Sequence, residues 1–256
     1  MSYKKKKSKP ANRQDKVNGE DIKDKSPYVY QRDKIKDFLT VKDLNWTEKQ
    51  KEFIKLGMEK ETKLVFVNGP AGSSKTLLSV YCALKLLNEK RISDIIYIRS
   101  AVESSESKLG FLPGDADEKL HFYNIPFIEK LDELLPRAEV DKLEKEKRIS
   151  TYPVNYARGM SWNAKCIIFD EAQNSSLKEI TTILTRLGKF SRCFILADPM
   201  QTDLPQNKAG GFDKCFDLFT NEESKENGVF SYQFDEEDIM RSPLVKFLVK
   251  KFKEIK

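Results

Sequence analysis

The chain has 256 residues, of which 39% are hydrophobic and 34% are charged, a composition typical of a globular protein with one large domain. Its apolar runs are far shorter than the roughly 18 residues that cross a bilayer, which excludes a transmembrane protein. No apolar stretch follows the basic N-terminus, which excludes a secretory signal.

The net charge of +6 is concentrated at the N-terminal end. Five lysines and no acidic residue lie among residues 1–9, which leaves 41 of the 46 basic residues against all 40 acidic residues in the rest of the chain. The lysine run favours an electrostatic arm for nucleic acid or another polyanion, or else a solubilising, disordered terminus. The nearly neutral remainder can still bind nucleic acid through a local groove.

The four cysteines have no spacing typical of a zinc or redox motif. They stand at Cys82, Cys166, Cys193 and Cys215, and two of them lie in apolar, strand-like runs. The pattern is typical of small core side chains in a reduced, cytoplasmic protein. We expect the protein to be located in the cytoplasm of a bacterium or of a phage-infected host cell.

Residues 1–40 are polar and predict a basic flexible tail and lead-in, and residues 41–256 predict one domain. Thr47 can cap a helix that ends near Gly57. Further helices are expected at Lys75–Asn88, Pro126–Leu135, Val140–Lys147, Ser176–Leu187, Phe212–Thr220 and Pro243–Ile255. Strands are expected at Leu64–Asn68, Asp94–Ile98, Ile149–Pro153, Lys165–Phe169, Arg192–Ala197 and Val229–Phe234.

These expected strands are short and almost continuously apolar, as are strands buried on both faces. They alternate with amphipathic helical segments along the chain. The pattern therefore predicts an α/β domain with a mostly parallel sheet and helices on both faces.

The first expected strand leads directly into GPAGSSKT, and a helical pattern follows. In this setting a phosphate loop surrounds a phosphate with backbone N–H groups and the helix N-terminus. Lys75 is expected to reach the β- and γ-phosphates, and the Thr76 hydroxyl to bind Mg²⁺. Ser74 stands where the pattern has glycine, so we expect retained nucleotide binding with altered geometry or affinity. The residues expected to bind the nucleotide are Gly69, Pro70, Ala71, Gly72, Ser73, Ser74, Lys75, Thr76 and Leu77.

An acidic pair follows the apolar run at residues 165–169. Asp170 is expected to hold Mg²⁺, and Glu171 to polarise the attacking water. At the carboxyl end of a parallel strand, both carboxylates would face the phosphate loop. A solvated acidic turn is the alternative interpretation.

Two glutamines are further candidates. Gln201 follows the strand expected at residues 192–197 and could sense the γ-phosphate or hold the attacking water, while Asp198 could support the metal. The amide of Gln50 matches the donor and acceptor edge of adenine, although a surface glutamine on a helix is the alternative.

These residues together resemble the PhoH family of P-loop ATPases, which is related to the first motor domain of superfamily 1 helicases. The resemblance covers roughly Asn45 to Lys250. It rests on GPAGSSKT at 69–76, VESSESKLGFLPGD at 102–115 with Lys119, YARG at 156–159, DEAQN at 170–174, LTRLG at 184–188, DPMQTDLP at 198–205 and MRSPLV at 240–245.

The resemblance implies a RecA-like P-loop fold with ATP and Mg²⁺ as ligands. By position, Gln50 would contact adenine, Asp170 would be the metal-site acid, and Gln201 would couple phosphate binding to strand binding. The catalytic set would be Glu171, Lys75, Gln201 and Arg241.

Each of three arginines has two possible roles. Arg241 resembles an arginine that approaches a γ-phosphate, or else it forms a structural salt bridge. Arg99 and Arg158 follow strand ends and would contact a nucleic-acid backbone or be structural.

The sequence departs from the family pattern at four positions. Ser74 and Ala197 each replace a glycine, and Ser104 and Ser105 replace an Ala-Gly pair. These changes put in doubt the nucleotide affinity and the shape of the loop that contains residues 104 and 105.

The chain has one such motor core, whereas helicase motors of this superfamily place ATP between two. An arginine finger would then come from another subunit. We therefore expect a homo-oligomer, with a ring as one form.

The sequence thus predicts a Mg²⁺-dependent ATPase that acts on, or is stimulated by, single-stranded RNA or DNA. The alternative is a nucleotide-dependent clamp with little turnover, which binds nucleic acid or a protein. Ser74 favours the clamp, and Glu171 with Gln201 favours the enzyme. A small-molecule phosphotransferase is a weaker third interpretation.

Overall fold

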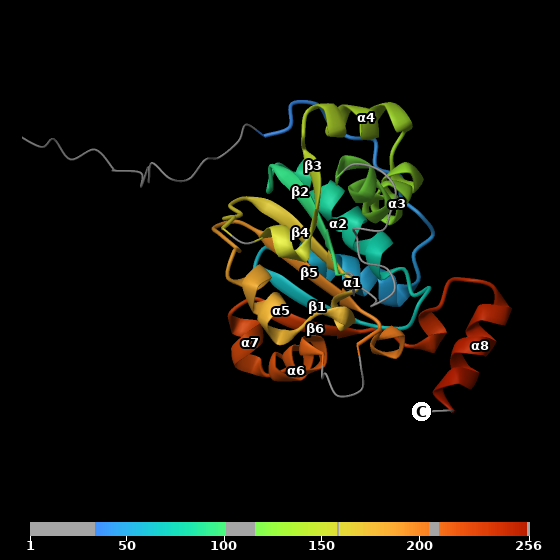
Figure 1. Ribbon diagram of the computed structural model, residues 1–256. Helices are drawn as coiled ribbons and strands as arrows, with labels where there is room; N and C mark the ends of the chain where they lie inside the picture. Colours follow the sequence, from blue (N-terminus) through green and yellow to red (C-terminus); the bar gives the residue numbers. More distant parts are fainter. Residues whose placement is uncertain (1–33, 101–115, 158, 205–209, 255–256) are drawn as a thin grey trace, which may run out of the picture. The chain divides into compact units, whose positions relative to one another are not determined.

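The computed structural model describes residues 34–100, 116–157, 159–204 and 210–254. Six strands form one sheet in the order β3-β2-β4-β5-β1-β6, and every paired neighbour is parallel (Figure 1). The strands are β1 (Leu64–Asn68), β2 (Asp94–Arg99), β3 (Ile149–Pro153), β4 (Lys165–Asp170), β5 (Arg192–Ala197) and β6 (Val229–Gln233). The predicted parallel α/β sheet is therefore confirmed.

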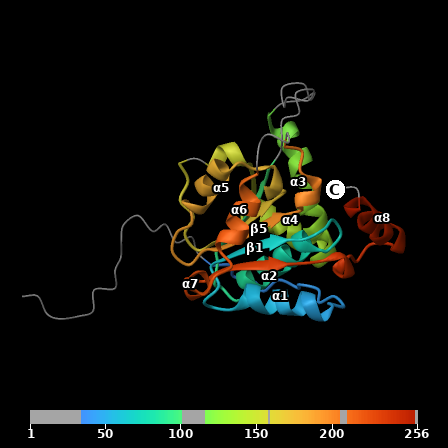
Figure 2. The same ribbon diagram turned by 90° about the horizontal axis from the view of Figure 1, so that it is seen from below.

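Helices cover both faces of this sheet. They are α1 (Glu48–Met58), α2 (Lys75–Asn88), α3 (Ala116–Leu134), α4 (Arg137–Lys145), α5 (Leu177–Leu184), α6 (Gly211–Leu218), α7 (Glu222–Glu226) and α8 (Pro243–Lys253). Short 3₁₀ turns lie at η2 (Val154–Ala157), η3 (Ala172–Asn174), η4 (Pro199–Gln201) and η5 (Glu236–Asp238). Figure 2 shows α5 and α6 on one side of the sheet and α1 and α2 on the other.

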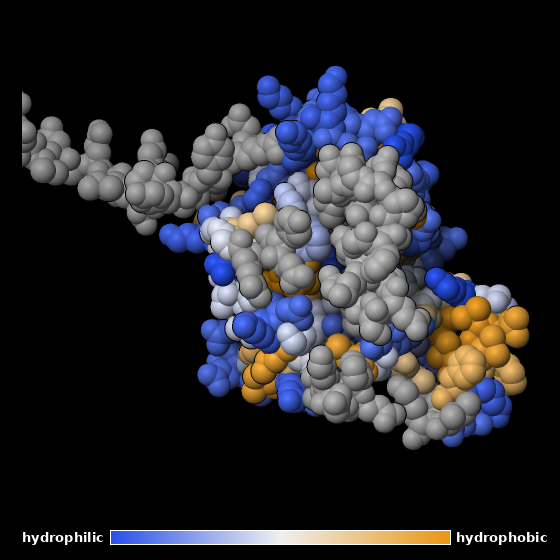
Figure 3. Space-filling view, in the orientation of Figure 1, coloured by the Kyte–Doolittle hydropathy of each residue, from blue (hydrophilic) through white to orange (hydrophobic). Residues whose placement is uncertain are grey.

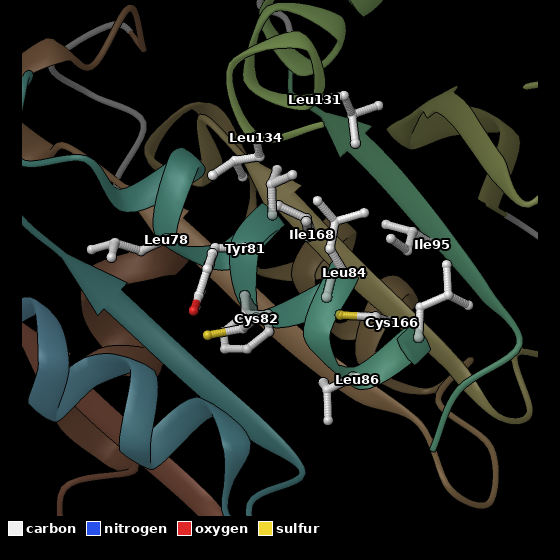
Figure 4. Packing of buried hydrophobic residues seen from close by; sticks show 14 of the residues in the cluster. Leu78, Tyr81, Cys82, Leu84, Leu86, Ile95, Leu131, Leu134, Cys166 and Ile168 are labelled. Atoms are coloured by element: carbon white, nitrogen blue, oxygen red, sulfur yellow. The ribbon is translucent and has the colours of Figure 1, made fainter. Parts of the chain in front are cut away.

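Two apolar clusters hold these layers together, because successive strand residues point to opposite faces. Val65 and Val67 of β1 belong to the cluster under α1 to α4, and Phe66 belongs to the cluster under α5 and α6. Figure 4 shows the first cluster, where α2 packs Leu78, Tyr81 and Cys82 between the sheet and its neighbouring helices.

Several helices differ from the sequence predictions, and α4 begins at Arg137 and not at the expected Val140. Pro126 does not begin a helix but lies inside α3, which starts ten residues earlier in the chain. Burial of Phe127, whose ring stacks on Tyr97 at 4.9 Å between centroids, favours this helix despite its proline. The predicted helix at Ser176–Leu187 ends earlier, at Leu184. The short α7 was not predicted, because it is polar and depends on the Asn221 cap.

Gly57 does not end its helix as predicted. It lies inside α1, where an added Cβ would come within 2.9 Å of the Cys82 sulfur on α2. Gly57 allows α1 and α2 to approach closely, and Glu59 is the C-cap of α1.

The part of the predicted lead-in that the structure describes packs on the domain. Ile35 and Leu39 are buried, and the Asn88 side chain bonds both the amide and the carbonyl of Leu39. Contacts with the domain therefore begin before the expected boundary at residue 41.

One apolar surface remains uncovered on the last helix. Leu244, Phe247, Leu248 and Phe252 of α8 are exposed, and Figure 3 shows apolar atoms gathered there. We call these four residues the α8 apolar face. Among the described helices, none has both the length and the apolar character to cross a membrane.

Candidate nucleotide-binding site

Three neighbouring strands bring the predicted motifs to one edge of the sheet. Strand β5 lies between β4 and β1, and all three run in the same direction. Their carboxyl ends carry Asp170, Asp198 and the loop that begins at Gly69. These motifs meet as expected for ends of parallel strands.

The phosphate loop departs from its usual sequence at a position with a left-handed backbone. Ser74 has φ 64° and ψ 18°, and its side chain does not cap α2. A side chain in this conformation costs about 1–2 kcal/mol, and glycine avoids that strain. Gly69 is required for space, because an added Cβ would lie 2.7 Å from Cβ of Phe234.

The remaining loop residues support the turn. Ser73 is buried and its hydroxyl donates to the Pro70 carbonyl at 2.8 Å, and Leu77 is also buried. The amide of Gly69 donates to the carbonyl of Ala197 at 3.2 Å. Ala197, which stands where the family pattern has glycine, is buried.

Lys75 points back at the loop that precedes it. Its Nζ donates to the carbonyl oxygens of Gly69 at 2.7 Å and of Pro70 at 3.0 Å. Burial lowers the pKa of Lys75, although the charges of Asp198, Asp170 and Glu171 oppose this shift. The first backbone N–H groups of α2 have no partners inside the helix. This end of the sheet is suited to an anionic ligand.

Thr76 and Asp170 form a pair of oxygen ligands. The Thr76 hydroxyl donates to Oδ2 of Asp170 at 2.9 Å, and Asp170 is buried. The Tyr97 hydroxyl donates to the same oxygen at 2.8 Å. Hydroxyl and carboxylate oxygens are ligands that Mg²⁺ prefers, usually together with phosphate oxygens and water, so these residues fit the metal.

Sequence reasoning missed Tyr97. It stands in an apolar strand, and only the adjacency of β2 and β4 brings its hydroxyl to Asp170. Burial raises its pKa well above the usual value, so Tyr97 remains a hydrogen-bond donor.

Glu171 has a left-handed backbone conformation with φ 56°. Two neighbouring residues contact its carboxylate. Its Oε2 accepts from Nε2 of Gln173 at 2.6 Å, and its Oε1 lies 3.7 Å from Nη2 of Arg99. Arg99 therefore has a structural ion pair, one of the alternatives left by the sequence.

Gln173 connects two strand ends and was also missed as a site residue, although it lies inside the DEAQN motif. Besides its bond to Glu171, its Oε1 accepts from the amide of Asp198 at 3.1 Å. Its Nε2 also donates to the Gln201 carbonyl at 3.3 Å. One buried amide thus links Glu171 to the segment after β5.

Asp198 binds the loop backbone. Its Oδ2 accepts from the Ala71 amide at 2.7 Å and its Oδ1 from the Met200 amide at 3.0 Å. Support of the metal by Asp198 stays a prediction. The Gln201 side chain is exposed, and Gln201 contacts Gln173 through its backbone carbonyl. The role of the Gln201 side chain in sensing phosphate stays a prediction.

Gln50 is buried and is not on the helix surface. It completes a capping box with Thr47, whose amide donates to Oε1 of Gln50 at 3.0 Å. The spacing T-x-x-Q is a sequence signal for this motif. Contact of Gln50 with adenine stays a prediction.

Arg241 lies against the phosphate loop of its own chain. A Cβ added at Gly72 would be 3.1 Å from Cγ of Arg241, and the Met240 amide donates to the Gly72 carbonyl at 3.0 Å. The approach of Arg241 to a γ-phosphate and a structural salt bridge of Arg241 both stay predictions. Arg158 and the segment 102–115, with Ser104 and Ser105, lie outside the described residues.

The sequence is similar to known proteins over most of its length. The family model described as PhoH-like protein matches residues 44–253. A PhoH-like protein from Bacillus subtilis is 34% identical over 203 residues, which cover 79% of this chain and 61% of that protein. Protein PhoH from Escherichia coli is 33% identical over 190 residues, covering 71% and 51%.

The chain thus spans about half to three-fifths of the length of these relatives. Among solved structures, Pif1 helicase from Candida albicans aligns with a TM-score of 0.36 and 15% identity, covering 75% of this chain and 40% of that one. The match of the family model over most of the sequence shows that the chain belongs to the PhoH-like protein family.

Proposed function

We propose that this chain binds ATP with Mg²⁺ and hydrolyses it. The observation that carries the proposal is the meeting of Thr76 with Asp170 at 2.9 Å beside the buried ammonium group of Lys75. Membership of a P-loop family supports the same conclusion. The loop amides and the N-terminus of α2 would hold the phosphates.

Each side chain has a distinct task in this proposal. Lys75 exchanges its two carbonyl partners for phosphate oxygens. Their negative charge lowers the free-energy cost of burying the ammonium group. Thr76 and Asp170 would hold Mg²⁺, which supplies charge neutralisation at the phosphates. Glu171, oriented by Gln173, accepts a proton from the attacking water.

Coupling to single-stranded RNA or DNA belongs to the same proposal. Gln173 bonds both Glu171 and the backbone of Gln201, so a shift of η4 would change the orientation of Glu171. A strand bound near η4 could in this way alter turnover. The proposal retains Gln201 as the residue that couples the two events.

A homo-oligomer is proposed from the α8 apolar face and Arg241. Arg241 lies beside Gly72, and the exposed face of α8 follows within a few residues. Subunit contacts at α8 would bury apolar surface close to the nucleotide and position an arginine there. The four cysteines are unpaired and buried, which supports a reducing cytoplasm as the location.

The second candidate is a nucleotide-dependent clamp with little turnover. The strained backbone of Ser74 favours it. Against it stands the position of Glu171, which Gln173 and Arg99 orient although a clamp needs no proton acceptor.

The test is ATP hydrolysis by the purified chain with and without single-stranded RNA and DNA, beside Lys75→Ala. Turnover that requires Lys75 and rises with one polymer supports the ATPase and identifies its partner class. ATP that is bound but not hydrolysed under any condition supports the clamp.

A further inference from the structure

A cavity of about 1350 Å³ opens at the edge of the sheet opposite the phosphate loop. Leu64, Arg192 and Val229, the first residues of β1, β5 and β6, line it. Ser93 and Ala164, which precede β2 and β4, line it as well. We call this cavity the amino-edge groove. It crosses the ends of five neighbouring strands, roughly 19 Å at about 4.8 Å per strand.

The lining of the amino-edge groove is strongly basic. Of the described residues that line it, seven are lysines or arginines and one, Glu89, is acidic. That glutamate already pairs with Arg91, with 3.3 Å between Oε2 and Nη1. The exposed Lys60 and Lys90 face solvent. The nearly balanced charge of the chain beyond residue 9 is therefore locally positive here, which attracts a polyanion.

Two buried polar groups in the groove lack partners. Among the described residues, Nη1 of Arg192 and the hydroxyl of Thr62 find no hydrogen-bond partner, and both residues are at least nine-tenths buried. The other Arg192 nitrogen, Nη2, donates to the Glu59 carbonyl at 2.7 Å and closes the end of α1. Burial lowers the pKa of Arg192 to about 10. Such groups are suited to a ligand that supplies acceptor oxygens.

An aromatic side chain completes the groove. Phe190 lines it with 70% of its surface exposed, on a turn held at φ 63°. An exposed ring beside lysines is an arrangement on which nucleic-acid bases stack while their phosphates are neutralised. At about 3.4 Å per stacked nucleotide, the groove length fits roughly five nucleotides.

We infer that the amino-edge groove binds single-stranded nucleic acid, with phosphates on its lysines and a base on Phe190. The inference rests on the proposed binding of nucleic acid and goes beyond it. The proposed coupling has a strand near η4, whereas the groove gives a second contact with nucleic acid at the opposite edge of the sheet. This second contact lies on the side of the sheet away from ATP. Acceptor oxygens of the strand would reach Thr62 and Arg192.

The test measures binding of fluorescent single-stranded RNA and DNA by anisotropy, over a range of salt concentrations. Lys60→Glu with Lys90→Glu changes two exposed side chains of the groove. The matched control, Lys145→Glu with Lys214→Glu, makes the same charge change outside it. We expect the groove variant to bind about ten-fold or more weakly, with a salt slope lower by about 1.4, and the control to lose clearly less affinity.

Further variants test the stacking of a nucleic-acid base on Phe190 and the contact with the buried polar groups. Phe190→Ala should weaken binding by about five-fold to a hundred-fold, and Phe190→Tyr should restore it. Thr62→Val should fold as the wild type does and bind the strand several-fold more weakly. Unchanged binding in Thr62→Val would overturn the contact with the buried groups.

The outcomes separate the two levels of the proposal. Wild-type binding that none of the groove variants alters would overturn the inference and leave the proposed function intact. Poly-glutamate that binds as tightly as RNA, with no effect of Phe190→Ala, would assign the groove to an acidic polypeptide. A wild type that hydrolyses ATP but binds neither polymer would overturn both the inference and the coupling, while the ATPase stands.

Discussion

The Tyr97 hydroxyl donates to Oδ2 of Asp170, the oxygen that also accepts from Thr76. The three side chains come from β2, β4 and the start of α2. Tyr97 therefore fixes the carboxylate at the position where a metal ligand is proposed, and its role is one of positioning.

Tyr97→Phe removes this hydrogen bond and keeps the ring that stacks on Phe127. We expect a loss of about 1 kcal/mol in the free energy of unfolding. The Mg²⁺ concentration that gives half-maximal ATP turnover should rise by about ten-fold. A Mg²⁺ titration of ATP hydrolysis measures this shift.

Tyr81→Phe is the matched control, because the Tyr81 hydroxyl also donates to a carboxylate, that of Asp43, outside the site. It should lower stability without changing the Mg²⁺ dependence. Equal Mg²⁺ dependence in wild type and Tyr97→Phe would show that Tyr97 has only a structural role.

Ser74→Gly should stabilise the protein, because it removes a side chain from a backbone with φ 64°. We expect a gain of about 1 kcal/mol in urea denaturation and tighter binding of ATP. Ser74→Ala retains Cβ and should behave as the wild type, since the serine hydroxyl makes no cap bond. A gain of the same size in Ser74→Ala would rule out backbone strain as its cause.

The buried ammonium group of Lys75 predicts a pH-dependent stability. Burial holds its folded pKa below the unfolded value of about 10.4. Below the folded pKa the full penalty of burying the charge applies. Between the two pKa values the unfolded chain binds more protons, so stability from this group rises with pH.

Lys75→Met lacks this penalty. Without nucleotide at pH 7 it should exceed the wild type by about 1 kcal/mol in free energy of unfolding, and the difference should shrink as pH rises towards 10.5. ATP should raise the melting temperature of the wild type only. A variant that is less stable at pH 7, or a difference independent of pH, would contradict this account of Lys75.

Phe247→Glu places a charge on the α8 apolar face, where the native side chain is 56% exposed. Light scattering in the presence of ATP should show an oligomer for the wild type and smaller species for the variant. Its ATP turnover should fall by about ten-fold or more if an arginine acts between subunits.

Phe38→Glu makes the same change at another exposed phenylalanine, 79% accessible and outside α8, and should leave assembly intact. A wild-type monomer with full turnover in ATP would end the oligomer proposal.

The strands and the site edge could be predicted from the sequence, because parallel strands buried on both faces are continuous apolar runs. Predicted and observed bounds of β4 differ by one residue, Asp170. Strand ends of one direction share an edge, so Lys75, Asp170 and Asp198 could be placed together before their distances were known.

Contacts that depend on strand order could not be predicted. Tyr97 meets Asp170 only because β2 pairs with β4. Arg241 reaches Gly72 because the chain returns to the phosphate loop after β6, which is paired with β1. The start of α3 was missed because the packing of Phe127 outweighs the local preference of Pro126.

Single-turnover hydrolysis of ATP by wild type and Glu171→Gln tests the central claim most directly. The amide can still accept from Gln173, so the site should keep its shape. We predict that the variant binds ATP as tightly as the wild type but hydrolyses it about a hundred-fold or more slowly. Equal hydrolysis rates, or no hydrolysis by the wild type with Mg²⁺, would contradict the proposal that this chain is an ATPase with Glu171 as its base.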